Sequence, residues 1–268
     1  MSDSAAQQDP ALLSVNGLVK DFGGLRAIDH CDLSVADGTI TGLIGPNGAG
    51  KSTLFDLITG FIAPDTGRVH FRGEDITNFP PYRMFRHGLA RTFQTPREQA
   101  SMTALENLML VPAEQCGERI WNNWLTPGRV ARDEVRHRDQ ALEVLEFMDL
   151  VHMADQPAGQ LSGGQKKLLE LARTLMADPK LVLLDEPAAG VNRSLMQRLA
   201  ETIETLARDR GITFLLIEHD IDLVMRLCNP VIVMSEGHHL MEGEPTTVRN
   251  DPRVLEAYLG GQYGAAGG

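Results

Sequence analysis

The chain has 268 residues, which at about 150 residues per domain is enough for one large domain or two. Hydrophobic residues make up 43% and charged residues 23%, a globular composition that excludes a disordered or fibrous chain. The formal net charge of −11 argues against a protein whose whole surface collects phosphates, as a general nucleic-acid binder does, and leaves room only for a local basic patch.

The amino-terminal residues 1–10 are polar and acidic and lack the basic start and apolar stretch of a secretory signal. No apolar run approaches the roughly 20 residues that a helix needs to cross a bilayer. We therefore expect a cytosolic chain without a transmembrane segment. Cys31, Cys116 and Cys228 form no Cys-x-x-Cys pair, so we expect reduced, mostly buried thiols and neither a disulfide framework nor a zinc site.

The first 60 residues contain β-type runs followed by one helix. Runs at 12–15 and 28–35 are separated by Asp-Phe-Gly-Gly at 21–24, which predicts an antiparallel sheet. An apolar strand at 40–44 then enters a glycine-rich turn, and the apolar residues within 51–59 recur as in a buried helix. This is a strand, loop and helix unit.

The later part of the chain alternates apolar runs with helical patterns. The runs at 181–184, 213–217 and 231–234 predict a parallel sheet covered by helices on both faces, so the fold class is α/β. Between about 80 and 160 the pattern is helical without clear strands and indicates an inserted helical lobe. A group of arginines beside this lobe is interpreted as solvated surface, with lipid headgroups or an acidic partner loop as the alternatives: Arg83, Arg86, Arg91 and Arg97.

A glycine-rich segment after the strand at 40–44 matches the pattern Gly-x-x-x-x-Gly-Lys-Ser/Thr. Its glycines allow the backbone to wrap around an anion, and successive N–H groups and the helix amino terminus supply positive potential. We expect a triphosphate site in which Lys51 binds the β and γ phosphates, Ser52 coordinates Mg²⁺ and Thr53 bonds a phosphate oxygen. The other residues of this predicted cradle are Gly45, Asn47, Gly48, Ala49 and Gly50.

Two carboxylates end the apolar run at 181–184. Ligands of open α/β sheets bind at the carboxyl ends of the strands, which favours a functional role for this pair. Asp185 is expected in the Mg²⁺ shell, and Glu186 is expected to polarise the water that attacks the γ-phosphate. The alternative is that Asp-Glu-Pro merely begins a turn.

A second candidate anion site precedes the helical pattern at 166–176 and consists of Ser162, Gly163, Gly164 and Gln165. A small polar residue and two glycines at a helix start form either a plain N-cap or a set of free N–H groups that bind an anion. The helical lobe separates this segment from Lys51, so it is not expected to reach the phosphate loop of its own chain. A second copy of the fold could bring the two together.

In this order, the motifs resemble those of the ATP-binding cassette ATPases. The resemblance rests on the phosphate loop, Leu-Ser-Gly-Gly-Gln at 161–165, Leu-Leu-Asp-Glu-Pro at 183–187 and a downstream histidine. In this family two domains pack head to tail, so the resemblance implies that the signature residues Ser162, Gly163 and Gly164 contact ATP held by the partner. ATP would then be part of the dimer interface.

The resemblance also implies a fold and a domain plan. The fold would be that of a phosphate-loop NTPase, with a RecA-like parallel-sheet core, an amino-terminal antiparallel β subdomain and an inserted helical subdomain. A single domain would span 11–260, with the helical subdomain at about 95–178. The segment 1–10 would be a disordered tail and 261–268 a flexible tail.

Three further residues match the family by their motifs. Gln94, in Arg-Thr-Phe-Gln-Thr-Pro, resembles the glutamine that joins the Mg²⁺ shell to the docking groove of the transport partner. His219, in Ile-Glu-His-Asp, resembles the switch histidine that contacts the γ-phosphate. Phe22 matches the aromatic residue that stacks on adenine, and a buried phenylalanine at a strand end is the alternative.

One segment departs from the family pattern. After Glu186 the chain has Ala-Ala-Gly-Val-Asn-Arg at 188–193, where the family loop often ends in Leu-Asp or Leu-Asn-Pro. Communication between the two ATP sites is therefore expected to differ.

A narrower resemblance connects the chain to the branched-chain amino acid uptake ATPases. It rests on Ala-Arg-Thr-Phe-Gln at 90–94, Asp-Glu-Pro-Ala-Ala-Gly at 185–190, Ile-Glu-His-Asp at 217–220, the segment 248–260 and the lobe insertion near 112–138. It implies an enzyme that hydrolyses ATP with Mg²⁺ at the cytoplasmic face of the bacterial inner membrane. The implied partners are a second cassette ATPase, identical or different, two membrane permeases and, indirectly, a periplasmic binding protein, but no nucleic acid.

Other assignments stay open at this point. Related cassettes serve urea, other amino acids or lipopolysaccharide export. A soluble cassette ATPase that acts on DNA or ribosomes is a further alternative, but such proteins usually carry tandem cassettes or a long coiled insertion, and this chain has neither.

Overall fold

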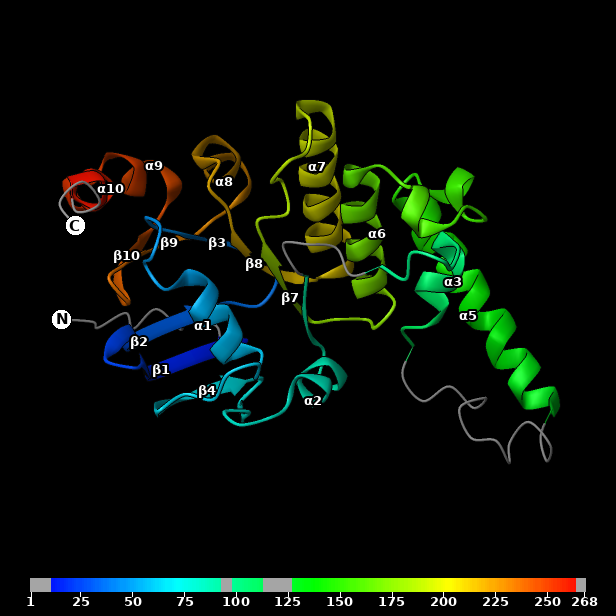
Figure 1. Cartoon of the computed structure of the whole chain (residues 1–268), viewed down its shortest axis with the longest axis horizontal. Helices are drawn as coiled ribbons and strands as arrows, with labels where there is room; N and C mark the ends of the chain where they lie inside the picture. Colours follow the sequence, from blue (N-terminus) through cyan, green and yellow to red (C-terminus); the bar gives the residue numbers. More distant parts are fainter. Residues whose placement is uncertain (1–10, 93–97, 113–126, 264–268) are drawn as a thin grey trace, which may run out of the picture.

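The computed structural model describes residues 11–92, 98–112 and 127–263, which form two β-sheets and surrounding helices (Figure 1). The strands are β1 (Leu13–Phe22), β2 (Leu25–Val35), β3 (Ile40–Ile44), β4 (Thr66–Phe71), β5 (Glu74–Asp75), β6 (Leu89–Arg91), β7 (Leu181–Asp185), β8 (Thr213–Ile217), β9 (Val231–Ser235) and β10 (His238–Gly243). The helices are α1 (Lys51–Ile58), α2 (Pro81–Arg86), α3 (Ala104–Met109), α5 (Pro127–Phe147), α6 (Gly163–Leu175), α7 (Arg193–Arg210), α8 (Ile221–Leu227), α9 (Pro245–Asn250) and α10 (Pro252–Tyr263), with short 3-10 turns at Val151–Met153 and Ala158–Gln160.

The smaller sheet has the strand order β2-β1-β4-β5 and is antiparallel throughout. Leu13 of β1 lies opposite Val35 of β2 on one side and Phe71 of β4 on the other. The predicted amino-terminal antiparallel sheet is therefore confirmed. β1 is longer than the run at 12–15 because shifts in its register with β2 between Val15 and Asp21 let the strand continue to Phe22.

The larger sheet has the order β10-β9-β3-β8-β7-β6 and is parallel except for β10 at one edge. Because parallel strands run in one direction, their carboxyl ends meet at one edge of the sheet. Ile44 and Asp185 therefore end neighbouring parts of the same edge, together with Ile217, which is paired with Asp185. The three segments that follow these residues form the site.

The central strands are buried on both faces, which explains why they appear in the sequence as unbroken apolar runs. Side chains alternate along a strand, so neighbours belong to different cores. Leu183 and Leu215 face α1 and the smaller sheet, whereas Leu184 and Leu216 face the core built with α6, α7 and α8. The predicted parallel sheet with two covered faces is confirmed.

A helical lobe packs beside α6 on the right of Figure 1. Its helices α3 and α5 contact each other and α6 through buried residues such as Leu108 and Leu145. Thr103 begins α3 with a capping box, in which its side chain accepts the Glu106 N–H at 3.1 Å and the Glu106 carboxylate accepts the Thr103 N–H at 2.8 Å. The inserted lobe is thus present.

One strand lies where a purely helical segment was expected. β6 (Leu89–Arg91) falls within the region 80–160 and pairs in parallel with β7, so the expectation of no strands there is wrong. Three residues are too few to show an alternation, and β6 exists because β7 offers an open edge.

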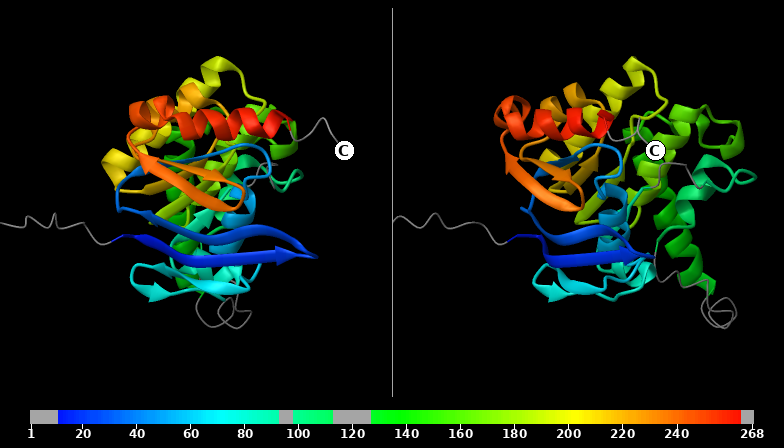
Figure 2. Two further views of the ribbon diagram at one scale, coloured as in Figure 1. Left: turned by 90° about the vertical axis from the view of Figure 1, so that its left-hand side faces the viewer. Right: turned by 60° about the vertical axis from the view of Figure 1, so that its left-hand side comes forward.

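The carboxyl-terminal helices α9 and α10 lie on one side of the β9–β10 hairpin and the amino-terminal sheet lies on the other (Figure 2). α10 continues to Tyr263, past the beginning of the tail expected at 261–268. Cys31 and Cys228 are buried free thiols, and burial raises the pKa of each to about 12. Cys116, residues 1–10 and the end of the expected tail lie outside the described residues.

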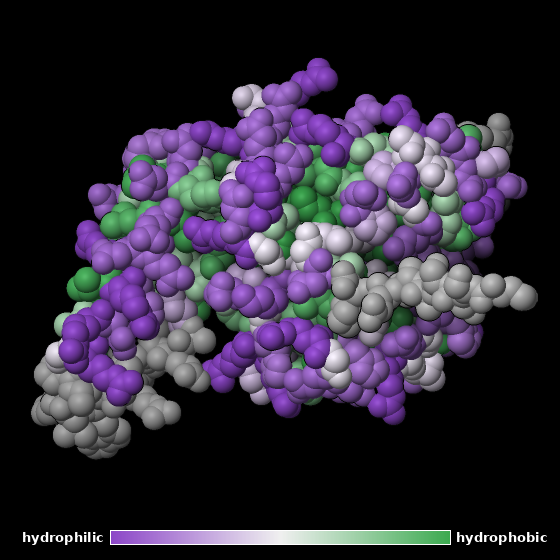
Figure 3. Space-filling model, turned by 180° about the vertical axis from the view of Figure 1, so that it is seen from behind, coloured by the Kyte–Doolittle hydropathy of each residue, from purple (hydrophilic) through white to green (hydrophobic). Residues whose placement is uncertain are grey.

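The face seen in Figure 3 is mostly hydrophilic, with hydrophobic residues in smaller areas between the polar ones. No helix among the described residues is both long and apolar enough to span a membrane.

Candidate functional site

The turn between β3 and α1 wraps tightly because two of its positions admit only glycine. Gly45 has φ 153°, and a Cβ there would lie 2.2 Å from the carbonyl oxygen of Met234. Gly50 has φ 96°, and a Cβ there would lie 2.6 Å from the carbonyl oxygen of Ala27. Gly50 also supplies no side-chain cap for α1, so the first N–H groups of the helix are left to a ligand.

Lys51 begins α1 directly after this loop and is only 7% exposed. Its ammonium donates to the carbonyl oxygens of Gly45 at 2.7 Å and Pro46 at 2.9 Å. Burial lowers the pKa of Lys51, whereas the nearby carboxylates of Glu186 and Asp185 act to raise it. The loop therefore surrounds a cation that two carboxylates help to keep charged.

A cavity of about 380 Å³ opens above the loop and brings together residues from distant parts of the chain. Among the predicted site residues, it is lined by Phe22, Asn47, Gly48, Ala49, Gly50, Lys51, Ser52, Thr53, Glu186 and His219. Phe22 is 44% exposed and its ring lies 5.6 Å from the Lys20 ammonium, so the alternative of a buried strand-end phenylalanine is wrong.

Glu186 and His219 line the same cavity as the phosphate loop. Glu186 directly follows β7 and has φ 49°, a left-handed conformation that turns the chain sharply at the sheet edge. His219 lies just beyond β8, and its Nε2 lies 2.9 Å from a carboxylate oxygen of Glu186. The candidate base is thus held by a second titratable group.

Asp185 is buried beside Glu186 and is paired with Arg91. Its Oδ2 accepts a hydrogen bond from Arg91 at 2.9 Å, and Arg91 also bonds to Asp56. Burial raises the pKa of Asp185, and the bond from Arg91 acts to lower it. The Arg91 side chain is only 9% exposed, so its interpretation as solvated surface is wrong. Arg91 is buried because it pairs with the carboxylates of Asp56 and Asp185, which lie 35 and 94 residues away in the sequence.

The residues present fit a Mg²⁺ ion. The Oδ1 atom of Asp185 is buried and accepts no hydrogen bond from the described residues, so one carboxylate oxygen is available for a cation. Ser52, which carries a hydroxyl oxygen, lines the cavity above the phosphate loop. No group of three or more His, Cys, Asp or Glu suited to a metal occurs in the described part of the chain. This agrees with the habit of Mg²⁺ of taking few protein ligands and the rest from phosphates and water.

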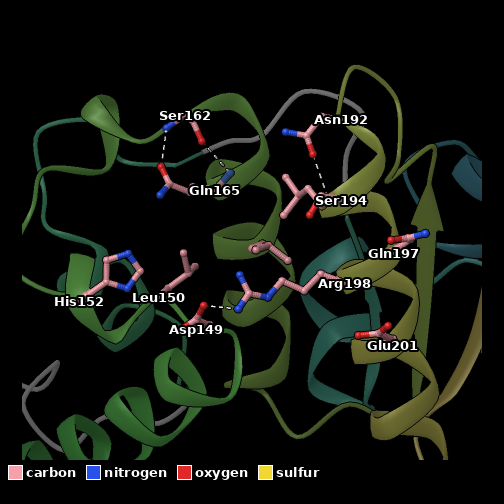
Figure 4. A pocket seen from close by; sticks show the side chains of 12 residues that line it. Asp149, Leu150, His152, Ser162, Gln165, Asn192, Ser194, Gln197, Arg198 and Glu201 are labelled. Atoms are coloured by element: carbon pink, nitrogen blue, oxygen red, sulfur yellow. Dashed lines mark hydrogen bonds and ion pairs between the residues drawn. The ribbon is translucent and has the colours of Figure 1, made fainter.

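The predicted signature segment lies elsewhere. Ser162 begins α6 with a capping box, since its hydroxyl accepts the Gln165 N–H at 3.3 Å and the Gln165 side chain accepts the Ser162 N–H at 2.9 Å. Ser162 and Gln165 line a different cavity, of about 630 Å³, between the helical lobe and α7 (Figure 4). The plain N-cap is therefore real, and the signature is not among the residues that line the Lys51 cavity.

The segment that departs from the family pattern also has a structural role. Asn192 caps α7, because its side chain accepts the Leu195 N–H at 2.9 Å. Position 164 has no room for a side chain, since a Cβ there would lie 1.8 Å from Leu195 Cδ2. A Cβ at Gly163, in contrast, would meet nothing within 4 Å. Gln94 lies outside the described residues.

Sequence reasoning did not single out Lys167 and Glu218, which both contact the segment after Glu186. The only signal was their position: Lys167 lies just after the signature, in the first turns of α6, and Glu218 lies within Ile-Glu-His-Asp, directly before His219.

Known proteins resemble the chain over nearly its whole length. Residues 28–189 match the family model for ABC transporters, and residues 239–264 match one described as branched-chain amino acid ATP-binding cassette transporter. The probable branched-chain amino acid transport ATP-binding protein LivG of Archaeoglobus fulgidus is 43% identical over 94% of this chain and 96% of its own. The high-affinity LivG of Escherichia coli strain K12 is 39% identical, with 93% and 98% covered. A nucleotide-free ATP-binding cassette from an ABC transporter superposes with a TM-score of 0.79 at 39% identity, over 92% and 98% of the two chains.

Proposed function

Because this chain belongs to the ABC transporter family, we propose that it binds and hydrolyses ATP to power an importer of branched-chain amino acids. The observation that carries the proposal is the assembly of Lys51, Glu186 and His219 around one cavity at the carboxyl edge of the parallel sheet. The cargo follows from the relatives that bear this name and from the match of residues 239–264.

The chemistry follows from the positions of the side chains. The N–H groups at the start of α1 and the Lys51 ammonium bind the phosphates, and ATP competes with the loop carbonyls for that ammonium. Ser52, Asp185 and Gln94 would hold Mg²⁺, which neutralises charge on the phosphate oxygens. Glu186 orients the attacking water and accepts its proton, while His219 keeps the carboxylate in place at 2.9 Å.

The assembly proposed for this chain is a head-to-tail pair of cassettes on two membrane permeases, supplied by a periplasmic binding protein. Ser162 lines a cavity other than that of Lys51, which supports a signature that serves the ATP of the second cassette. The proposed location is the cytoplasmic face of the membrane.

The variant Glu186→Gln tests the proposal. We expect phosphate release to fall at least about 100-fold, because the water loses its base, while ATP binding is retained. A closed dimer should accumulate with ATP and be detectable by size-exclusion chromatography. Lys51→Ala is the control that loses ATP binding itself.

Wild type and Glu186→Gln also test the cargo, in proteoliposomes that contain the permeases. With the binding protein and ATP, wild type should drive uptake of leucine, and Glu186→Gln should not. Normal phosphate release by Glu186→Gln would remove Glu186 from its role, and uptake of urea in place of leucine would exclude the proposed cargo.

A further inference from the structure

The segment 186–189, called the Glu186 loop, holds the candidate base in an unfavourable backbone conformation. Glu186 has φ 49°, a value that residues with a Cβ adopt rarely and keep only where the surroundings hold them. The backbone supplies few bonds of its own: the Glu186 N–H donates to Ile217 O at 2.9 Å, the Ala189 N–H to Glu186 O at 3.1 Å and the Val191 N–H to Ala188 O at 3.2 Å. Other groups must hold the loop.

One of these groups is Lys167 on the signature helix α6. Its ammonium donates to the carbonyl oxygen of Glu186 at 3.1 Å and also to that of Ala189. The side chain is partly buried, and burial lowers the pKa of Lys167 while Glu218 and Glu186 act to raise it. A single cation on α6 therefore bonds both ends of the loop.

The second group is Glu218, at the end of β8. It is 4% exposed, and its two oxygens accept different backbone N–H groups: Ala188 at 2.6 Å and His219 at 3.1 Å. One carboxylate thus connects the middle of the Glu186 loop to the backbone of His219. The charges match the backbone dipoles, since the cation takes the carbonyls and the anion takes the N–H groups.

We propose that Lys167 and Glu218 are positioning residues that hold Glu186 and His219 in register with the signature helix of the same chain. The inference rests on the proposed function and extends it. Neither residue lines the Lys51 cavity, so each acts through the Glu186 loop. A shift of α6, which begins at Ser162, is then transmitted through Lys167 to the carbonyl of Glu186.

This arrangement gives the signature a second consequence. If ATP held by the partner chain displaces Ser162, the position of Glu186 in the chain that carries Ser162 changes as well. The link is short, because Lys167 lies within the first two turns of α6 and donates directly to the carbonyl of Glu186, the residue that follows β7.

The structural part of the proposal is tested without any enzymatic activity. Hydrogen–deuterium exchange of the full nucleotide-free chain should show faster exchange in peptides covering 185–193 in Lys167→Met and Glu218→Gln. In Glu218→Gln, the amide can accept only one of the two N–H bonds. Lys166→Met is the matched control, because Lys166 is adjacent on α6 but pairs with Glu98 at 2.8 Å. Unchanged exchange in Lys167→Met, or equal acceleration in Lys166→Met, would overturn the proposal.

Steady-state hydrolysis tests the functional part. In Lys167→Met we expect kcat to fall about 10-fold with KM for MgATP changed less than about 2-fold, because binding is intact and the base is misplaced. Lys167→Arg should recover most of kcat, since a guanidinium can still donate to both carbonyls. Lys166→Met should stay within about 2-fold of wild type in both constants.

These outcomes separate the two proposals. If wild type releases no phosphate from ATP, the proposed function is wrong, and the exchange measurement still decides the role of Lys167 and Glu218. If wild type is active and Lys167→Met keeps its full kcat, the positioning role is wrong. A Lys167→Met chain that fails to fold, as judged by circular dichroism, is replaced by Glu218→Gln, for which the same split of kcat from KM is required.

Discussion

At the scale of single residues, the most consequential side chain whose role the motifs did not reveal is Arg91. It is buried between Asp56, which follows the phosphate loop, and Asp185, the proposed Mg²⁺ ligand. Two carboxylates this close would repel each other without a cation between them. The positive charge of Arg91 therefore offsets the two carboxylates, and its bond to Oδ2 of Asp185 leaves Oδ1 available.

Removing this arginine should destabilise the fold. Arg91→Met leaves two partly or fully buried carboxylates without their cation, and we expect a loss of about 3 kcal/mol in the free energy of unfolding. Arg91→Lys should lose less stability, because the positive charge remains. It should still lose some, because lysine lacks the several N–H donors with which the guanidinium bonds both carboxylates. Urea unfolding followed by circular dichroism measures the difference.

The matched control is Arg68→Met, since Arg68 is also paired with an aspartate, Asp75, but lies at the surface. An exposed ion pair contributes less than about 1 kcal/mol. If Arg91→Met were as stable as Arg68→Met, the buried ion pair would have no structural weight.

At the scale of elements, one glycine of α6 packs tightly against a side chain of α7. A Cβ at Gly164 would lie 1.8 Å from Leu195 Cδ2, so Gly164→Ala must displace Leu195. We expect a loss of about 1 kcal/mol, near the low end for overpacking because the contacted atom ends a side chain. Thermal or urea unfolding provides the measurement.

The adjacent glycine supplies the comparison. Gly163→Ala should be neutral or stabilising by up to about 1 kcal/mol, because a Cβ there meets nothing and alanine favours a helix. The double variant Gly164→Ala/Leu195→Ala should recover part of the loss by removing the clash. A Gly164→Ala chain as stable as Gly163→Ala would show that α7 yields without cost.

The same scale shows what the sequence could and could not predict. The central strands β3 and β8 were predicted with the observed bounds, because strands buried on both faces leave continuous apolar runs. β6 was missed because three residues carry no period. Motifs located Lys51 and Glu186, whose chemistry depends on local spacing. They did not reveal the roles of Arg91, Lys167 or Glu218, since those side chains act on backbone or carboxylates that only the folded chain brings near.

At the scale of the whole molecule, the phosphate loop and the signature of one chain line separate cavities. Under the proposed head-to-tail pairing, a complete ATP site takes its Lys51 from one chain and its Ser162 from the other. An isolated chain would hold two halves of different sites. This division makes a prediction that no single variant can test.

Two inactive variants should restore each other. Lys51→Ala destroys the phosphate-loop half and Ser162→Arg destroys the signature half, so a mixed dimer keeps one complete site out of two. Random pairing makes about half of the dimers mixed, and about a quarter of the wild-type phosphate release should therefore return in an equal mixture. Lys51→Ala mixed with Asp185→Asn is the control, because both changes affect the same half and no site becomes complete. If both mixtures stayed inactive at every protein concentration, two copies of this chain would not share their ATP, and the second half would have to come from the same chain or from a different cassette.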